Sequence, residues 1–289
     1  MFIVNPISGG KEKKRILSLL EQFASQNCYE VDIRQTGAKG DAITLARESD
    51  ADLVVAVGGD GTVNEVAQGL IGQDKILGII PCGSGNGLAL HLGISLNPKR
   101  ALRTLLEGRI ELIDYAQINE HPFFSISGIG LDADVAWEFA TTGHRGLWTY
   151  ISLAWEKWRQ FRAETYSIDI DGNTITTPAV IIAVGNSNQW GNQARITSLA
   201  SVCDGMLDVC IVKPFKTIEI PVLATKLLTG RAHTSRRIRM IRGKRIMIRR
   251  QHEGPAHYDG EPCFESDEIL VSAIPAALKV VVPSNGRTI

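Results

Sequence analysis

The chain has 289 residues, of which 44% are apolar, and its 31 basic and 31 acidic side chains give a formal net charge of zero. This length suits about two globular domains, and the neutral balance gives no indication of a nucleic acid as a partner. No apolar run reaches the roughly 18 residues of a membrane span, and the five cysteines show no C-x-x-C spacing, so we expect a cytoplasmic protein with reduced thiols.

Strands and helices are predicted to alternate over the first 118 residues. The apolar run 2–4 starts the pattern, and a helix and a strand over 29–34 follow it. Two further apolar runs, 54–57 and 76–80, each lead through a glycine-rich turn into a helix. This alternation is typical of a doubly wound α/β domain with a parallel sheet.

Three turns after these strands combine glycine with polar residues: Asn5 to Gly9, Gly58 to Thr62 and Gly83 to Asn86. Glycines let backbone N–H groups approach a phosphate, and a following helix adds its positive N-terminal end. We expect the three turns to lie together, because open α/β sheets bind ligands at the carboxyl ends of their strands. The carboxylate of Asp60 suits a place beside Mg²⁺ or the role of proton acceptor, and the alternative is a capping Asp in an ordinary connection.

Strands dominate beyond about residue 118, so the second domain should be mainly antiparallel. The dipeptide Asp171-Gly172 predicts a hairpin turn. The predicted strands cover residues 123–126, 166–171, 179–184, 207–212, 238–241, 245–248 and 269–273.

One predicted helix, over 147–162, carries an aromatic stripe. Ile151 lies along one side with Trp148, Trp155 and Trp158, and basic residues follow nearby. Tryptophan with basic neighbours suits a membrane surface, but an aromatic stripe also suits a protein core. The sequence leaves both interpretations open.

At these turns the chain resembles the diacylglycerol kinase catalytic-domain family, which includes bacterial lipid kinases and sphingosine and ceramide kinases. The matching motifs are N-P-x-S-G from Asn5, G-G-D-G-T from Gly58, G-[ST]-G-N from Gly83, and Asp259-Gly260-Glu261. The resemblance implies an α/β N-terminal domain, doubly wound and with NAD-kinase-like three-layer architecture, over residues 1–118. It also implies an antiparallel β-sandwich over 119–275, with residues 276–289 rejoining the first domain.

The resemblance further implies an ATP-dependent lipid kinase that phosphorylates a hydroxyl of a membrane lipid, with diacylglycerol as the leading substrate. The alternatives are a sphingoid-base, ceramide or phosphatidylglycerol kinase, then an NAD kinase, and then a catalytically silent lipid- or nucleotide-binding regulator. ATP, Mg²⁺ and a lipid are the implied ligands, together with peripheral contact with a membrane. The sequence leaves open whether the chain forms a homodimer.

The family pattern also suggests roles for individual residues. Glu261 is the expected general base, with Asp259 and Asp60 as rivals, and the alternative is a hairpin turn followed by a solvated glutamate. Asp204, with carbonyl groups of Ser201 and Met206, would hold a structural Mg²⁺ or Ca²⁺ ion, and the alternative is an Asp-Gly turn between strands. The residues implied in ATP binding are Asn5, Pro6, Ser8, Gly9, Thr36, Gly58, Gly59, Asp60, Gly61, Thr62, Asn64, Glu65, Gly83, Ser84, Gly85 and Asn86.

Overall fold

The computed structural model describes residues 1–6, 16, 18–22, 25, 30–141, 147–190 and 194–284. The chain divides into two compact units. Unit 1 comprises Met1–Ile113 with Ala276–Ile289, and unit 2 comprises Asp114–Pro275. Ser8 and Gly9, and most of the helix predicted after them, lie outside the described residues.

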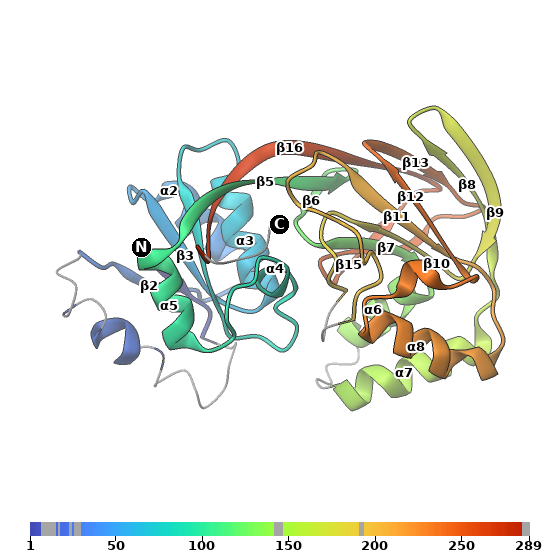
Figure 1. Cartoon of the computed structure of the whole chain (residues 1–289), viewed down its shortest axis with the longest axis horizontal. Coiled ribbons are helices and arrows are strands. Elements are labelled where there is room, and N and C mark those ends of the chain that lie inside the picture. The colour runs from blue at the N-terminus through green and yellow to red at the C-terminus, as the bar shows by residue number, and fades with distance from the viewer. Residues whose placement is uncertain are drawn as a thin grey trace. The chain divides into compact units, whose positions relative to one another are not determined.

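Unit 1 is built on a parallel sheet, whose strands run in the order β2-β1-β3-β4-β16 (Figure 1). Neighbouring strands end in register, so Gly58 pairs with Pro81. β1 lies inside the sheet, with β2 on one side and β3 on the other, which is a doubly wound order. Such sheets bind ligands outside the carboxyl ends of their strands. The strands are β1 (Phe2–Val4), β2 (Ile33–Gln35), β3 (Leu53–Gly58), β4 (Ile76–Pro81) and the C-terminal part of β16 (Glu268–Val282).

The helices of unit 1 form because their apolar residues recur at helical spacing. Val63, Val66, Ala67 and Leu70 are buried at positions i, i+3, i+4 and i+7 of one helix, so that face packs inward. Another helix is started by Asn97, whose side chain accepts the Lys99 N–H at 3.0 Å. The helices are α2 (Asp41–Glu48), α3 (Asp60–Leu70), α4 (Gly87–His91) and α5 (Pro98–Glu107).

Unit 2 contains two layers of strands. The first is a six-stranded antiparallel sheet in the order β12-β11-β10-β7-β14-β15. Its strands are β7 (Ile126–Gly130), β10 (Ile181–Gly185), β11 (Leu207–Val212), β12 (Ile238–Gly243), β14 (Gly254–Tyr258) and β15 (Glu261–Glu265). The second layer contains the N-terminal part of β16 with β13 (Arg245–Arg249), β8 (Glu164–Ile170) and β9 (Asn173–Ala179). β5 (Arg109–Ile118) also pairs with β16, and β6 (His121–Phe123) pairs with β5.

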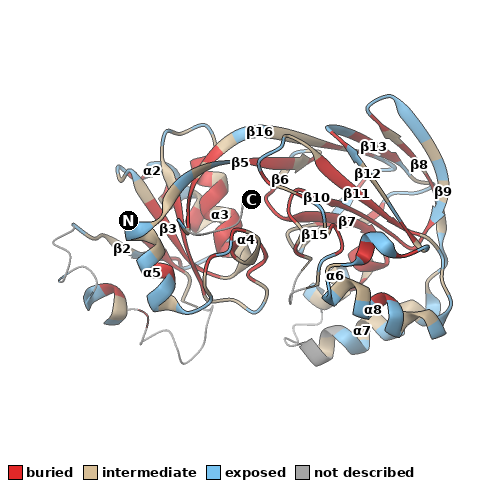
Figure 2. Ribbon diagram, viewed as in Figure 1, coloured by how far each residue is buried: buried red, intermediate tan, exposed pale blue. Residues whose placement is uncertain are grey.

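The central strands β10 and β11 of the six-stranded sheet are buried on both faces, as β11 illustrates. Leu207, Val209 and Ile211 pack into the core shared with the second strand layer, whereas Cys210 and Val212 belong to a separate core on the other face. That other face is covered by α6 (Leu131–Thr141), α7 (Leu147–Gln160) and α8 (Ile220–Leu228) (Figures 1 and 2). Because side chains alternate along a strand, one apolar strand can serve both cores.

The predicted fold class, a doubly wound α/β domain with a mainly antiparallel β-sandwich, is confirmed. The strand expected over 269–273 continues to Val282 as one strand, β16, in which Ala276 has φ 49°. Helices α6 and α8 were not predicted; both cover the sandwich with apolar residues. No helix within the described ranges is long and apolar enough to cross a membrane.

Candidate active site

The first glycine turn joins β3 to α3 at the carboxyl edge of the unit 1 sheet. β3 ends at Gly58 and α3 begins at Asp60, with Gly59 extended between them. The Val63 N–H donates to the Gly59 carbonyl at 3.0 Å, which starts the helix. The first N–H groups of an α-helix have no acceptor within the helix, so this turn offers amide donors and the positive end of the helix dipole to an anion.

The second glycine turn follows β4 and is closed by its own asparagine. The Asn86 side chain accepts the Gly83 N–H at 2.9 Å through Oδ1 and donates to the Gly83 carbonyl at 2.6 Å through Nδ2. Asn86 itself has φ 54°, a left-handed conformation that asparagine tolerates better than most residues. Ser84 is exposed at the tip of the turn.

Asp60 connects the two turns. Its Oδ2 accepts the Asn86 N–H at 2.8 Å, and its Oδ1 accepts the Gly87 N–H at 2.6 Å. The approach is close enough to require glycine, since a Cβ at Gly85 would lie 2.4 Å from Asp60 Oδ2 and one at Gly83 would lie 2.4 Å from the Gly59 Cα. Each carboxylate oxygen has a second lone pair, so Asp60 can hold the turns together and still face a cation or a proton.

The structure brings two more predicted residues to this edge. The Asn5 N–H donates to the Val57 carbonyl at 3.2 Å as the chain leaves β1. Thr36 follows β2, where its N–H donates to the Val4 carbonyl at 3.0 Å and its side chain is buried. Pro6 comes directly after Asn5. The predicted nucleotide residues that the structure describes therefore follow the ends of β1, β2, β3 and β4 or lie on α3.

Three further predicted residues on α3, Thr62, Asn64 and Glu65, have side chains that contact or pack within unit 1. Thr62 and Asn64 are buried, and Asn64 Oδ1 accepts a hydrogen bond from the Gln68 side chain. Glu65 Oε1 accepts the Gly40 N–H at 3.0 Å, directly before α2. These contacts support the helices that flank the turns.

In unit 2 the Asp259-Gly260-Glu261 motif forms a two-residue hairpin turn between β14 and β15. Asp259 and Gly260 have φ angles of 49° and 85°, and Tyr258 pairs with Glu261 across the turn. The Asp259 carboxylate accepts the N–H groups of Phe124, Ser125 and Ile126 at 2.9, 2.8 and 3.0 Å. Asp259 is thereby a structural anchor for the segment before β7, while Glu261 is half-buried at the start of β15.

A buried contact between a histidine and an aspartate, which the sequence did not indicate, lies beside this hairpin. His257 Nε2 is 3.1 Å from Asp132 Oδ2, and both side chains are almost fully buried. Among the described residues His257 Nδ1 has no hydrogen-bond partner. A histidine in a strand gave no signal in the sequence, because its partner on α6 is 125 positions away.

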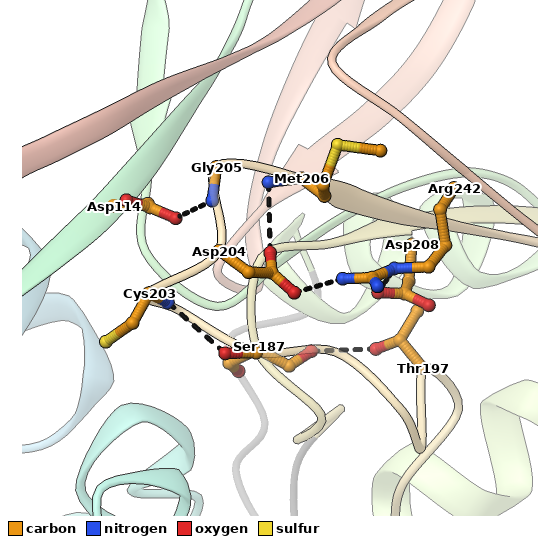
Figure 3. Close-up of polar contacts among 10 residues, drawn as sticks. Asp114, Ser187, Thr197, Cys203, Asp204, Gly205, Met206, Asp208 and Arg242 are labelled. Atoms are coloured by element: carbon orange, nitrogen blue, oxygen red, sulfur yellow. Dashed lines mark hydrogen bonds and ion pairs between the residues drawn. The ribbon is translucent and has the colours of Figure 1, made fainter. Parts of the chain in front are cut away.

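The loop before β11 contains the predicted metal ligands and is organised by an arginine (Figure 3). Asp204 Oδ1 accepts the Met206 N–H at 3.0 Å, and Asp204 Oδ2 pairs with the Arg242 guanidinium. Arg242 Nε also lies 3.4 Å from Asp208 Oδ2. Burial raises the pKa of the Asp208 carboxyl, and the charge of Arg242 opposes that shift.

This loop offers oxygen atoms of the kind that Mg²⁺ and Ca²⁺ prefer, but its Asp204 carboxylate already pairs with Arg242. Ser201 Oγ accepts the Cys203 N–H at 3.3 Å, and Asp114 Oδ2 accepts the Gly205 N–H at 2.6 Å. A divalent ion on Asp204 would have to share that carboxylate with Arg242, so the residues as placed do not fit the ion without movement of the arginine. No cluster of three or more His, Cys, Asp or Glu side chains suited to a metal occurs among the described residues.

Two family models together match most of the chain. The diacylglycerol kinase catalytic domain matches residues 1–118, and the YegS C-terminal NAD kinase beta sandwich-like domain matches residues 125–282. A diacylglycerol kinase of Bacillus subtilis is 31% identical over 269 residues, which cover 90% of this chain and 88% of that protein. A probable YegS-like lipid kinase of Chromohalobacter salexigens is 28% identical over 268 residues, covering 88% of this chain and 85% of that protein.

Solved structures show the same fold. A putative diacylglycerol kinase from Bacillus anthracis superposes with a TM-score of 0.81 at 24% identity, over 100% of this chain and 95% of that chain. An NAD kinase from Archaeoglobus fulgidus, solved in complex with ATP, superposes with a TM-score of 0.54 at 14% identity, over 99% of this chain and 94% of that chain.

Proposed function

The chain belongs to the diacylglycerol kinase catalytic-domain family of lipid kinases, and from this premise we propose that it transfers the γ-phosphoryl group of ATP to the free hydroxyl of diacylglycerol. The choice of lipid is supported by the relatives named diacylglycerol kinase, which include one at 31% identity. Sphingoid bases, ceramide and phosphatidylglycerol are the competing acceptors.

The observation that carries the proposal is the pair of glycine turns locked by Asp60. In unit 1 we assign ATP binding to the turns Gly58–Thr62 and Gly83–Asn86, with Asn5, Pro6 and Thr36 beside them. Backbone N–H groups bind phosphate oxygens without competing for the proton of the lipid hydroxyl, and rigid turns keep them aimed as the γ-phosphoryl group moves. A bound Mg²⁺ would neutralise phosphate charge, and the lone pairs of Asp60 that do not accept amides suit it.

The reaction requires a base as well as a phosphate site. The lipid oxygen forms a bond to the γ-phosphorus as the bond from that phosphorus to the β–γ bridging oxygen breaks, and ADP leaves with that oxygen. The hydroxyl proton passes to a carboxylate, for which we propose Glu261. Asp259 is less suited to this role, because its two oxygens already accept three backbone N–H groups. Asp259 instead fixes the hairpin on which Glu261 lies.

A substrate panel tests this proposal. Diacylglycerol, sphingosine, ceramide, phosphatidylglycerol and NAD are each offered with labelled ATP and Mg²⁺, and we expect diacylglycerol to be phosphorylated fastest. Preferred transfer to NAD would instead favour the NAD kinase that shares this fold. Absence of transfer to every acceptor, with ATP still bound, would favour a silent regulator.

A further inference from the structure

Large apolar side chains are exposed along the helical layer of unit 2. On α7, Ile151 and Trp155 are 46% and 50% exposed. On the short helix η2 (Thr217–Glu219) and on α8, the exposed fractions of Ile218, Val222 and Leu228 are 82%, 59% and 61%. We call these five residues the apolar ridge. A cluster of exposed apolar side chains on a folded protein marks an interaction surface more often than scattered single residues do.

The helices that carry the ridge belong to one layer. Both helices pack against the same core cluster outside the six-stranded sheet, α7 through Trp158 and α8 through Leu227. The Trp158 ring stacks on Phe215 with centroids 4.3 Å apart, and its Nε1 donates to Thr217 Oγ1 at 3.4 Å. Ile151, Trp155 and Trp158 follow one another at helical spacing on one side of α7, so the two exposed side chains continue a stripe that reaches η2 at Thr217. Helices α7 and α8 lie on the same side of the unit (Figures 1 and 2).

The surroundings of the ridge are basic. Residues 147–162 and 213–231 contain seven lysines and arginines but only two acidic residues. One of those acids, Glu219, pairs with Arg237 at 2.8 Å, which leaves Glu156 on α7 as the other. Arg159 follows Trp155 by four positions on α7 and is exposed, as is Lys216 two positions before Ile218. Exposed apolar side chains flanked by positive charge are the pattern of proteins that bind at the surface of an anionic bilayer.

We propose that the apolar ridge and the basic residues around it dock unit 2 onto an anionic lipid bilayer. Apolar side chains, with Trp155 among them, enter the boundary between headgroups and acyl chains, and Arg159 and Lys216 face the lipid phosphates. A second copy of this chain is a poorer occupant, since two surfaces of the same positive charge repel each other. The docking proposal rests on the proposed function in one respect. The proposed acceptor lipid lies in a bilayer, which gives the protein a reason to dock there.

Vesicle binding tests the docking surface directly. The full chain is mixed with phosphatidylcholine vesicles that contain either 30% phosphatidylglycerol or none, and bound protein is separated by flotation. We expect binding to the anionic vesicles that weakens as NaCl is raised. Ile218→Ser/Val222→Ser should reduce that binding about tenfold or more, because two exposed apolar side chains no longer enter the bilayer. Arg159→Gln/Lys216→Gln should remove most of the salt dependence.

Leu106→Ser is the matched control, because Leu106 is 43% exposed on α5, an element of unit 1 that carries no residue of the ridge. It should bind vesicles like the wild type, and all variants should keep the wild-type melting temperature. Equal binding by the wild type and Ile218→Ser/Val222→Ser would overturn the proposal. So would a wild-type dimer in sedimentation velocity that this double variant dissociates, because a second copy would then cover the ridge.

Kinase assays separate docking from the proposed function. On long-chain diacylglycerol in anionic vesicles, the ridge variant should lose turnover roughly in proportion to its lost binding, while turnover on a dispersed short-chain diacylglycerol should stay unchanged. Equal loss on both substrates would overturn docking as the function of the ridge. Intact vesicle binding by a wild type that phosphorylates neither form of diacylglycerol would retain the docking surface and reject the proposed substrate.

Discussion

Asp60 accepts one backbone N–H on each carboxylate oxygen, so its role can be tested by removing a single acceptor. We expect Asp60→Asn to lower both stability and turnover, because one N–H of the second glycine turn would meet an amide NH₂ instead of an oxygen. Loss of such a bond costs about 1–3 kcal/mol. Misplacement of the turn should reduce turnover about 100-fold. Thermal unfolding and transfer of labelled phosphate per folded molecule measure the two effects.

Asp171→Asn is the control for this change. The Asp171 carboxylate accepts the N–H groups of Lys244 and Arg245, each at 2.9 Å, in a hairpin of unit 2. We expect a similar loss of stability with turnover close to the wild type. Wild-type turnover in Asp60→Asn, or equal inactivity in both variants, would contradict the role of Asp60 in the phosphate site.

Glu261 and Asp259 lie two positions apart but should respond differently to substitution. Glu261→Gln should reduce turnover by about 10²–10⁴, the range for loss of a general base, with an unchanged melting temperature. Asp259→Asn should lower the melting temperature as well, because three backbone N–H groups share its carboxylate. Single-turnover assays avoid interference from slow product release.

A surface glutamate controls for the loss of charge. Glu268 forms an exposed ion pair with Arg249 at 2.7 Å, and Glu268→Gln should leave turnover unchanged. If Glu261→Gln retained more than about a third of wild-type turnover with chemistry rate-limiting, the base would be another residue.

At the scale of elements, the Asp204 carboxylate in the loop before β11 can be neutralised either by Arg242 or by a bound cation. We expect Asp204→Ala to lower the melting temperature, because it removes one of the two acidic partners of Arg242 and the acceptor of the Met206 N–H. Repeating the measurement with Mg²⁺ or Ca²⁺ tests the predicted ion, which would raise the melting temperature of the wild type but not of the variant. Arg242 alone balances the charge if neither protein responds to either cation.

The elements around the proposed phosphate site could be predicted because their signals are local. Glycine turns after apolar runs identified the ends of β3 and β4, and the family motif added Asn86. The contacts that fix the site were not predictable in this way, because Asp60 reaches residues 26 and 27 positions away and Asp259 reaches residues more than 130 away. A sequence pattern reports which residue types are present, whereas their pairing depends on how strands are brought together.

The helical layer of unit 2 shows the same limit. The aromatic stripe of α7 was compatible with either a core or a membrane surface. In the structure one part of the stripe is packed in the core and another part is exposed. Trp158 packs against Phe215, whereas Trp155 is half exposed. α8 was not predicted, because an almost wholly apolar nine-residue segment has no clear amphipathic pattern.

At the scale of the whole molecule, unit 1 depends on the end of the chain. Lys279 and Val280 of β16 pair with Ile76 and Leu77 of β4, and Leu278, Val280 and Val282 are almost fully buried. Ending the chain after Pro275 should therefore remove roughly 5–9 kcal/mol of burial, comparable to the stability of a typical domain. Proteolysis and thermal unfolding should show unit 1 unfolded, whereas a chain that ends after Ser284 should unfold like the wild type. An undiminished melting transition in the shorter chain would contradict this dependence.

The stability of the whole chain should also depend on pH through Asp208. Burial raises the pKa of this carboxyl in the folded protein, so the folded state holds its proton more tightly than the unfolded state does. Compared with Asp208→Asn, the wild type should therefore lose stability as pH rises from below about 4 through the raised pKa. Melting temperatures of both proteins between pH 3.5 and 7.5 measure this difference.

Asp74 provides a control of opposite sign. Its hydrogen bond with Lys279 lowers the pKa of the Asp74 carboxyl, so its contribution is present at neutral pH and is lost as pH falls. Asp74 is exposed, and the effect of Asp74→Asn should be small. A stability difference between the wild type and Asp208→Asn that grows in favour of the wild type as pH rises would contradict the assignment for Asp208.

The continuous strand β16 has a consequence for the order in which the chain is completed during synthesis. Residues 1–113 leave the ribosome first, yet the sheet that they form receives its edge strand only with residues 276–282. Residues 114–275 form one uninterrupted segment, so unit 2 has all of its strands before unit 1 does. The part of the chain that is translated first is therefore the part that is finished last, and until then β4 presents an unpaired edge with which another chain could pair.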